Sequence, residues 1–167
     1  MVIQQIKMAY EGSFKMRDRA ETKRIILHDS HSTPDSESRL GKLLLAAFKE
    51  GALNIEYHFV ITTDGSIFET RPMDSVGNHT PGHNLDSIGV CLMGGRKMVY
   101  TADRKYMIAR PADTFTTEQK ASLRWLIDHL KDHYGGHLEV FGQSEVQTLV
   151  GRWKGVQEPP MDLTKFR

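Results

Sequence analysis

Three short apolar runs rich in branched side chains restrict this chain to a fold built on a β-sheet. They cover residues 24–28, 57–62 and 87–93, and each passes at its carboxyl end into polar residues or glycine. Runs of roughly four to eight such residues bounded by turn formers are typical of buried strands. Asp64-Gly65, just after the second run, predicts a hairpin into a further strand. We expect the run at 87–93 to be a central strand of the sheet.

Two stretches with a period of three to four residues predict helices beside these strands. Apolar residues recur at that spacing over 36–50 and again over 117–134. The first stretch ends at Gly51, and the second follows Thr116, a good N-cap, and ends at Gly135. Together with the strands they predict an α/β fold with a mixed central sheet flanked by helices. The length of 167 residues fits a single domain.

Charge and cysteine content exclude several classes of protein. The formal net charge is +1, from 22 Lys and Arg residues against 21 Asp and Glu residues. We therefore expect no membrane surface and no specific nucleic acid among the partners. Cys91 is the only cysteine, so the chain forms no internal disulfide. The first 23 residues hold no apolar stretch typical of a secretory signal, and we expect a cytoplasmic protein, in the host cytoplasm if the chain is phage-encoded.

Eight histidines invite a metal hypothesis, but their spacing does not support one by itself. No pair shows the helical spacing typical of zinc enzymes on a functional face. His58 and Tyr57 are adjacent in a strand, so one is expected in the core and the other at a functional surface. The remaining candidates are expected to be ordinary surface residues: His31, His129, His133 and His137.

Five blocks of residues, taken in order, carry a family resemblance. They are ILHDS at 26–30, EYHFVI at 56–61, DG at 64–65, GNHTPGHNLDSIGVCLMGG at 77–95 and GQSEV at 142–146. Together they are similar to the zinc-dependent N-acetylmuramoyl-L-alanine amidases, especially the amidase-type lysozymes of short-tailed phages. The peptidoglycan recognition proteins are more distant relatives. The resemblance implies an amidase-like domain over 23–167 behind an N-terminal extension over 1–22, and it leaves the insert at 96–111 unmatched.

The resemblance implies a metal-dependent hydrolysis of peptidoglycan. In this family three side chains hold Zn²⁺, which lowers the pKa of a bound water to about 7 so that it attacks the lactyl amide. His28 stands at the first ligand position, while Tyr57 and His79 match residues that assist the reaction. The groove for the substrate, a muramyl peptide, would be bordered by Asn84, Gly94 and Gly95.

Two of the three expected zinc ligands are replaced. Gln143 occupies the position of the second ligand, a histidine in the family, and Glu158 occupies that of the third. A carboxylate suits zinc, whereas a neutral amide oxygen is a poor donor. The lysine expected near the third ligand is Val156 here, and only Lys154 could replace it. We therefore expect zinc to bind weakly or not at all at this set.

Several functions stay open at this point. In the first, hydrolysis is weakened or lost and the groove still binds peptidoglycan fragments. In the second, His31 or His137 completes the metal site and the chain is an active amidase. In the third, the chain regulates a protein partner such as a phage RNA polymerase, as members of the resembled family do. The basic segment at 1–16 would then be a docking arm. A cysteine hydrolase using Cys91 is disfavoured, because that residue lies in an apolar strand.

Overall fold

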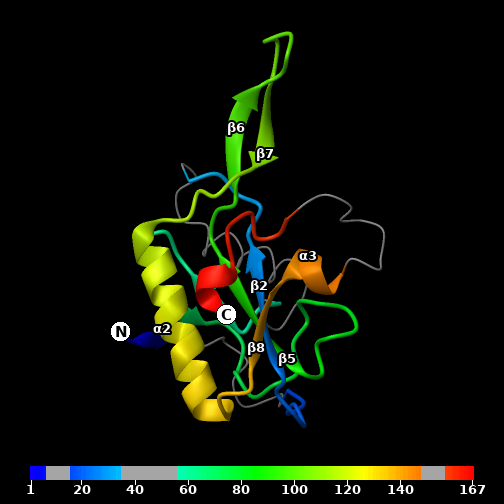
Figure 1. Ribbon diagram of the computed structural model, residues 1–167, viewed down its shortest axis with the longest axis vertical. Helices are drawn as coiled ribbons and strands as arrows, with labels where there is room; N and C mark the ends of the chain where they lie inside the picture. The colour runs from blue at the N-terminus through cyan, green and yellow to red at the C-terminus, as the bar shows by residue number, and fades with distance from the viewer. Residues whose placement is uncertain (7–15, 35–55, 148–156) are drawn as a thin grey trace.

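A six-stranded mixed sheet forms the centre of the molecule (Figure 1). The computed structural model describes residues 1–6, 16–34, 56–147 and 157–167. The sheet runs in the order β1-β4-β3-β5-β2-β8, and only β3 and β4 pair antiparallel. The mixed sheet confirms the predicted fold class. Its strands are β1 (Ile3–Gln5), β2 (Arg24–Asp29), β3 (Phe59–Ile61), β4 (Ile67–Glu69), β5 (Ser87–Leu92) and β8 (Glu139–Gly142).

The two central strands, β2 and β5, lie almost wholly out of contact with solvent. Every residue of β5 is buried, and so are five of the six residues of β2. Because they pair in parallel, with His28 opposite Cys91 and Asp29 opposite Leu92, their carboxyl ends meet at one edge of the sheet. The chain beyond them stays in register, since the amide of Ser30 donates to Leu92 O at 3.0 Å. Polar residues that follow either strand are thereby brought to one place.

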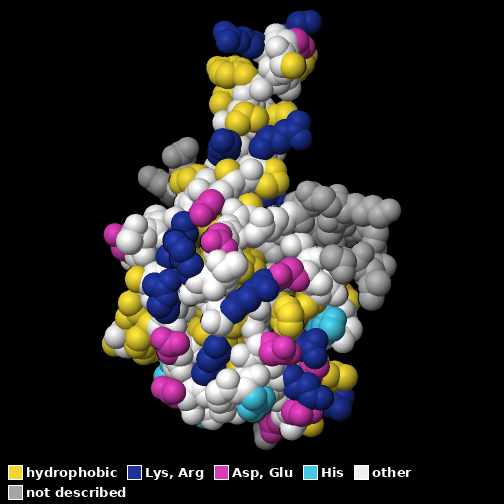
Figure 2. All heavy atoms as spheres, in the orientation of Figure 1, with side chains coloured by type: hydrophobic (Ala, Val, Ile, Leu, Met, Phe, Trp, Pro, Cys, Tyr) yellow, Lys and Arg dark blue, Asp and Glu magenta, His cyan; other side chains and the backbone are white. Residues whose placement is uncertain are grey.

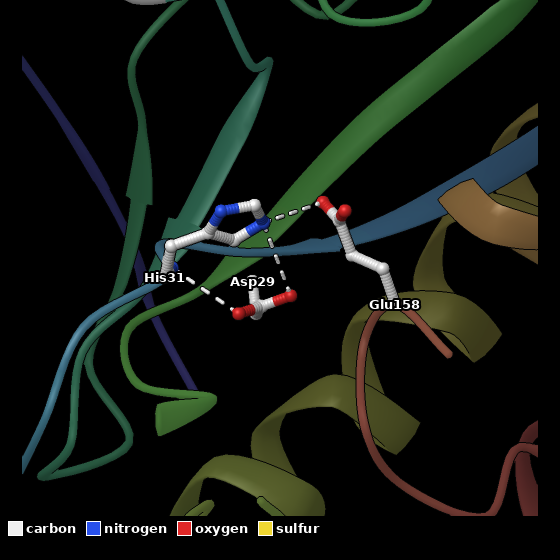
Figure 3. A group of neighbouring side chains, drawn as sticks. All are labelled: Asp29, His31 and Glu158. Atoms are coloured by element: carbon white, nitrogen blue, oxygen red, sulfur yellow. Dashed lines mark hydrogen bonds and ion pairs between the residues drawn. The ribbon is translucent and has the colours of Figure 1, made fainter. Parts of the chain in front are cut away.

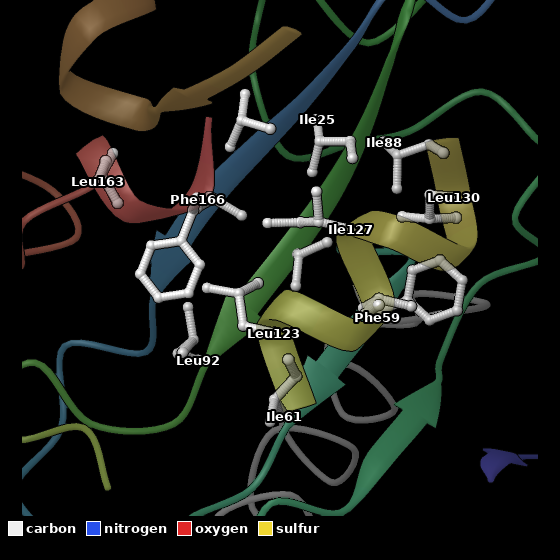
Figure 4. Packing of buried hydrophobic residues seen from close by; sticks show 14 of the residues in the cluster. Ile25, Phe59, Ile61, Ile88, Leu92, Leu123, Ile127, Leu130, Leu163 and Phe166 are labelled. Carbon is white, nitrogen blue, oxygen red and sulfur yellow. The ribbon is translucent and has the colours of Figure 1, made fainter. Parts of the chain in front are cut away.

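A long helix, α2 (Thr117–Tyr134), packs on the sheet and closes the core. Thr116 caps it as predicted, with its hydroxyl accepting from the amide of Gln119 in a capping box. Figure 4 shows the apolar side of the helix against the sheet, and the contacts there include Leu123, Ile127, Ile25, Ile88 and Phe59. The helix ends at Gly135, which has the positive φ that glycine adopts easily. The helix predicted at 36–50 lies outside the described residues.

A buried amide ties this helix to two strands. Gln119 is fully buried, and its Nε2 donates to Ile61 O at 3.1 Å and to Met93 O at 2.9 Å. These carbonyls lie at the ends of β3 and β5, so one side chain joins the first turn of α2 to the edge of the sheet at which the polar residues gather. Two shorter helices complete the described chain: α3 (Gln143–Val146) and η2 (Thr164–Phe166).

A second sheet of two strands projects away from the body (Figure 1). It consists of β6 (Arg96–Tyr100) and β7 (Met107–Pro111), paired antiparallel. This hairpin is the insert that the resemblance left unmatched. Figure 2 shows hydrophobic and basic side chains along it. Its large exposed apolar residues are Met98, Tyr100, Tyr106 and Met107.

The N-terminal residues take part in the sheet. β1 lies parallel to β4, with Ile3 opposite Ile67. The boundary expected at residue 22 stays a prediction, as does the docking arm over 1–16, of which residues 7–15 lie outside the described part of the chain. Within the described ranges, none of the helices has the length and apolar character needed to cross a membrane.

The buried Gln119 gives a stability prediction. Gln119→Leu removes both hydrogen bonds inside the core, and we expect the free energy of unfolding, measured with urea, to fall by about 1–3 kcal/mol. Asp128→Leu, at an exposed position of the same helix, is the control and should change it by no more than about 0.5 kcal/mol. Equal losses in the two variants would contradict the role given to the amide.

Candidate functional site

The carboxyl edge of the sheet holds a polar pocket of about 310 Å³. It is formed where the end of β2, the residue before β3, the loop before β5, the start of α3 and the C-terminal segment meet. The lining residues are His28, Asp29, Ser30, His31, Tyr57, His79, Gln143 and Glu158. Five of the residues singled out from the sequence are thus brought together, although they span most of the chain.

His79 is held inside the pocket wall by two glycines. A Cβ added at Gly77 would come within 2.5 Å of the His79 ring, and one at Gly89 within 2.4 Å. Both positions must therefore lack a side chain for the imidazole to be buried there. Asn84, which the resemblance placed in the groove, instead holds this loop. Its Oδ1 accepts from the amides of His79 and Thr80, each at 2.9 Å, and it is absent from the pocket lining.

A threonine hydroxyl connects the two residues at the first and second zinc positions of the resembled family. Thr80 Oγ1 donates to Gln143 Oε1 at 2.8 Å and lies 3.3 Å from His28 Nε2. The same nitrogen of His28 also lies 3.0 Å from Nδ1 of His79. Thr80 is fully buried, and His28 is almost so. The side-chain atoms that would face a metal are therefore satisfied by one another.

Burial keeps the histidines of this region neutral. Loss of solvation lowers the pKa of His28 and of His58 well below the ordinary value, and it lowers the pKa of His79 to about 3. His58 lies in the core beneath the pocket, where its Nδ1 accepts from the Gly89 amide at 3.0 Å. Its neighbour Tyr57 lines the pocket, with its pKa raised by burial. The prediction that one of the two belongs to the core is confirmed for His58.

A second cluster at the same edge joins His31 to two buried carboxylates (Figure 3). His31 Nε2 lies 3.1 Å from Glu158 Oε1 and 3.6 Å from Asp29 Oδ1. The hydrogen bond from Glu158 raises the pKa of His31, while burial raises the pKa of Asp29 to about 6. Arg96, at the base of the hairpin, donates to the other oxygen of Asp29 at 3.1 Å. Glu158, expected as a partner of His28, is therefore paired with His31.

The two glycines after β5 support this cluster from behind. Gly94 and Gly95 both have positive φ, and a Cβ at Gly95 would lie 2.1 Å from Asp29 Oδ2. The Gly94 amide donates to Ser30 Oγ at 2.9 Å. They lie behind the pocket lining and give the Asp29 carboxylate its room. Lys154, the predicted substitute for the family's lysine, lies outside the described residues.

Zinc does not fit the set of residues at the family's ligand positions. His28 offers a good donor, but its Nε2 is shared with His79 and Thr80. Gln143 offers an amide oxygen that already accepts from Thr80, and amides bind zinc poorly. Glu158 directs its carboxylate to His31. Cys91, which would be the preferred thiolate donor, is buried in mid-strand and its pKa is raised by burial, so it stays a thiol and serves neither as ligand nor as nucleophile.

Three participants escaped the sequence analysis. Thr80 gave no signal, because a threonine in a glycine-rich loop is ordinary. Asp29 and His31 could have been found as polar residues at the carboxyl end of a buried parallel strand, which is where α/β sheets place their sites. His31 was considered only as one alternative ligand among loop histidines.

Comparisons with known proteins agree with these features. The family model for N-acetylmuramoyl-L-alanine amidase matches residues 18–154. The endolysin of Klebsiella phage KP32 is 35% identical over 118 residues, covering 71% of this chain and 72% of the relative.

Solved structures share the fold at lower identity. The N-acetylmuramoyl-L-alanine amidase LysC from Clostridium intestinale URNW superposes with a TM-score of 0.64 at 22% identity, covering 88% of this chain and 85% of that one. The peptidoglycan recognition proteins LCa and LCx, solved with bound tracheal cytotoxin, give a TM-score of 0.60 at 19% identity, with 88% and 87% covered.

The buried histidines predict a loss of stability in mild acid. Below their ordinary pKa of about 6.5, histidines of the unfolded chain bind protons while His28, His58 and His79 stay neutral in the native state. Unfolding then takes up protons, and stability falls as the pH falls from 6.5 toward the lowered native values. Asp29 opposes this below its raised pKa, but it is one group against three.

Urea unfolding at pH 7 and pH 5.5 tests this prediction. We expect the free energy of unfolding to fall by roughly 2–4 kcal/mol, because each neutral histidine contributes about 1.4 kcal/mol per pH unit. The exposed pair His129 and His133 provides the control. Replacing both with glutamine should leave the change with pH intact. A midpoint that does not move between the two pH values would show that the buried imidazoles are protonated in the native state.

Proposed function

Since the chain belongs to the N-acetylmuramoyl-L-alanine amidase family, we propose that it binds muramyl-peptide fragments of peptidoglycan in the pocket around His28 and Tyr57, with zinc-dependent hydrolysis weakened or lost. The first half of the proposal concerns recognition and rests on the pocket. The second half concerns the metal and rests on the contacts of Thr80.

Recognition is supported by the chemistry of the pocket and by its relatives. A volume of about 310 Å³ suits one segment of a ligand, such as the junction between sugar and peptide, and not a whole wall fragment. Its lining offers hydrogen-bond donors and acceptors to amides and hydroxyls, with the Tyr57 ring as an apolar surface. Peptidoglycan recognition proteins share the fold, and the LCa and LCx pair holds tracheal cytotoxin in that region of fold space.

The loss of hydrolysis is supported by one observation above all. The Thr80 hydroxyl joins His28 and Gln143, the residues that stand at two of the zinc positions. Zinc in this family activates the attacking water. With an amide in place of imidazole and with Glu158 turned to His31, this chain's residues offer no comparable set of donors.

A second candidate function is an active amidase whose cation is held by His31 and Glu158. The 3.1 Å contact between these side chains favours it, because it places an imidazole where the third ligand of the family lies. Release of soluble muramyl peptides from purified sacculi with added zinc separates the two functions. Turnover at ordinary hydrolase rates, about 1–10³ s⁻¹, would establish the second.

Binding is tested by calorimetry with muramyl dipeptide. Tyr57→Phe removes one hydroxyl from the pocket, and we expect the affinity to fall by about three- to tenfold, the value of one hydrogen bond of about 1 kcal/mol. Tyr106→Phe makes the same change on the projecting hairpin and should leave the affinity unaltered. No measurable binding by the parent protein would exclude a wall-fragment pocket.

Hydrolysis is tested by restoring the family's ligands. The triple variant Thr80→Ala, Gln143→His and Glu158→Cys removes the bridging hydroxyl and supplies imidazole and thiolate donors. We expect zinc-dependent release of soluble product above that of the parent, measured on purified sacculi. Gln143→His alone is the matched control, since it leaves Thr80 and the His31 pairing in place. If the triple variant gains no activity although it is folded and binds zinc, the loss of hydrolysis has another cause.

A further inference from the structure

We infer that Asp29, His31 and Glu158 form a zinc site of their own, distinct from the set at His28 and Gln143. The cluster lies at the carboxyl end of β2, where the C-terminal segment passes the sheet (Figure 3). One ligand atom from each residue lies within 4.8 Å of the others. This inference concerns a cation and holds whether or not the pocket binds a muramyl peptide.

The spacing of the donor atoms matches tetrahedral zinc. Zinc binds nitrogen and carboxylate oxygen at about 2.0–2.2 Å, so two ligands of a tetrahedron lie about 3.4 Å apart. His31 Nε2 lies 3.1 Å from Glu158 Oε1 and 3.6 Å from Asp29 Oδ1, on either side of that value. A cation can enter between these three atoms with small side-chain shifts, and the fourth position would face the pocket that the same residues line.

Two buried oxygens of the cluster have no hydrogen-bond partner. They are Asp29 Oδ1 and Glu158 Oε2, both inaccessible to solvent. A buried carboxylate oxygen without a donor is costly, and proteins normally satisfy it with a hydrogen bond or a cation. Their side chains are 0% and 5% exposed, so bulk water does not satisfy them. These orphan acceptors indicate a ligand that the surrounding side chains do not supply.

The charges around the cluster favour a cation but limit its affinity. Arg96 balances one of the two buried carboxylates through the oxygen of Asp29 that faces away from His31. The His31 amide donates to the same oxygen at 3.2 Å, which fixes Oδ1 as the atom turned toward the imidazole. One negative charge remains for His31 or for a metal to compensate. The guanidinium so close to the site predicts micromolar binding in place of the tighter binding of structural zinc sites.

The donor set selects zinc among the common divalent ions. One imidazole and two carboxylates make a three-ligand site with room for a fourth, as zinc accepts. Calcium and magnesium require about six oxygen ligands, which the described residues here do not offer. Manganese tolerates the same donors but binds more weakly in the general order of metal affinities. His31 is the residue that sets this preference, and its side chain is 42% exposed, so zinc can reach it from solvent.

Calorimetry of the metal-free protein with zinc chloride tests the site. We expect one zinc per chain, weaker binding of manganese and no binding of magnesium. His31→Ala changes an exposed residue and should fold normally, yet it should lower zinc affinity by at least about 100-fold, because even an outer-shell partner contributes roughly 10–100-fold. His137→Ala makes the same change at another exposed loop histidine and should have no effect.

Two further variants locate the ion. Glu158→Gln keeps the size of the side chain and should abolish the rise in unfolding temperature that zinc gives the parent. Gln143→Leu should leave zinc affinity unchanged, whereas zinc held at the family's position would lose affinity. The inference is overturned if the parent binds no zinc, if His31→Ala binds it normally, or if Gln143→Leu weakens it. Because muramyl dipeptide binding is measured separately, failure here leaves the proposed function untouched.

Discussion

The parallel pairing of β2 with β5 determines where every polar residue of the pocket lies. Both strands are buried, so their register is set by apolar contacts that cannot shift by one residue without exposing the core. Once His28 lies opposite Cys91, the chain beyond each strand must leave the sheet at the same edge. Gln119 then holds α2 to that edge through two backbone carbonyls. The pocket is thus a product of the core, and its polar groups need no long loops to bring them together.

Burial of so many polar groups gives the pocket its character. The imidazole of His79 is enclosed by Gly77 and Gly89, and it is joined to His28 and, through Thr80, to Gln143. Each group is satisfied by a neighbour, so none is poised to give or take a proton near neutral pH. The cluster at His31 is different, because two of its carboxylate oxygens have no donor. The same edge therefore carries one closed polar network and one open one.

Patterns within the sequence predicted much of this arrangement. Branched apolar runs located β2, β3 and β5, and the Thr116 cap located the start of α2, since these signals are local. The family motif also located Gln143 and Glu158. It did not show that Glu158 pairs with His31, because that contact depends on how the C-terminal segment returns to β2. The position of Thr80 between His28 and Gln143 joins residues 63 apart and was equally hidden.

The hairpin of β6 and β7 is free of the constraints that govern the rest of the chain. Its strands pair only with each other, and most of its side chains are exposed, so little of the core depends on them. Mutations there escape the purifying selection that folding imposes. Insertions or deletions of one residue in each strand keep the antiparallel register, and the arm can lengthen or shorten over generations without disturbing Asp29 or Glu158. In this protein a segment open to evolutionary change begins at Arg96, one residue from a buried polar cluster that is not.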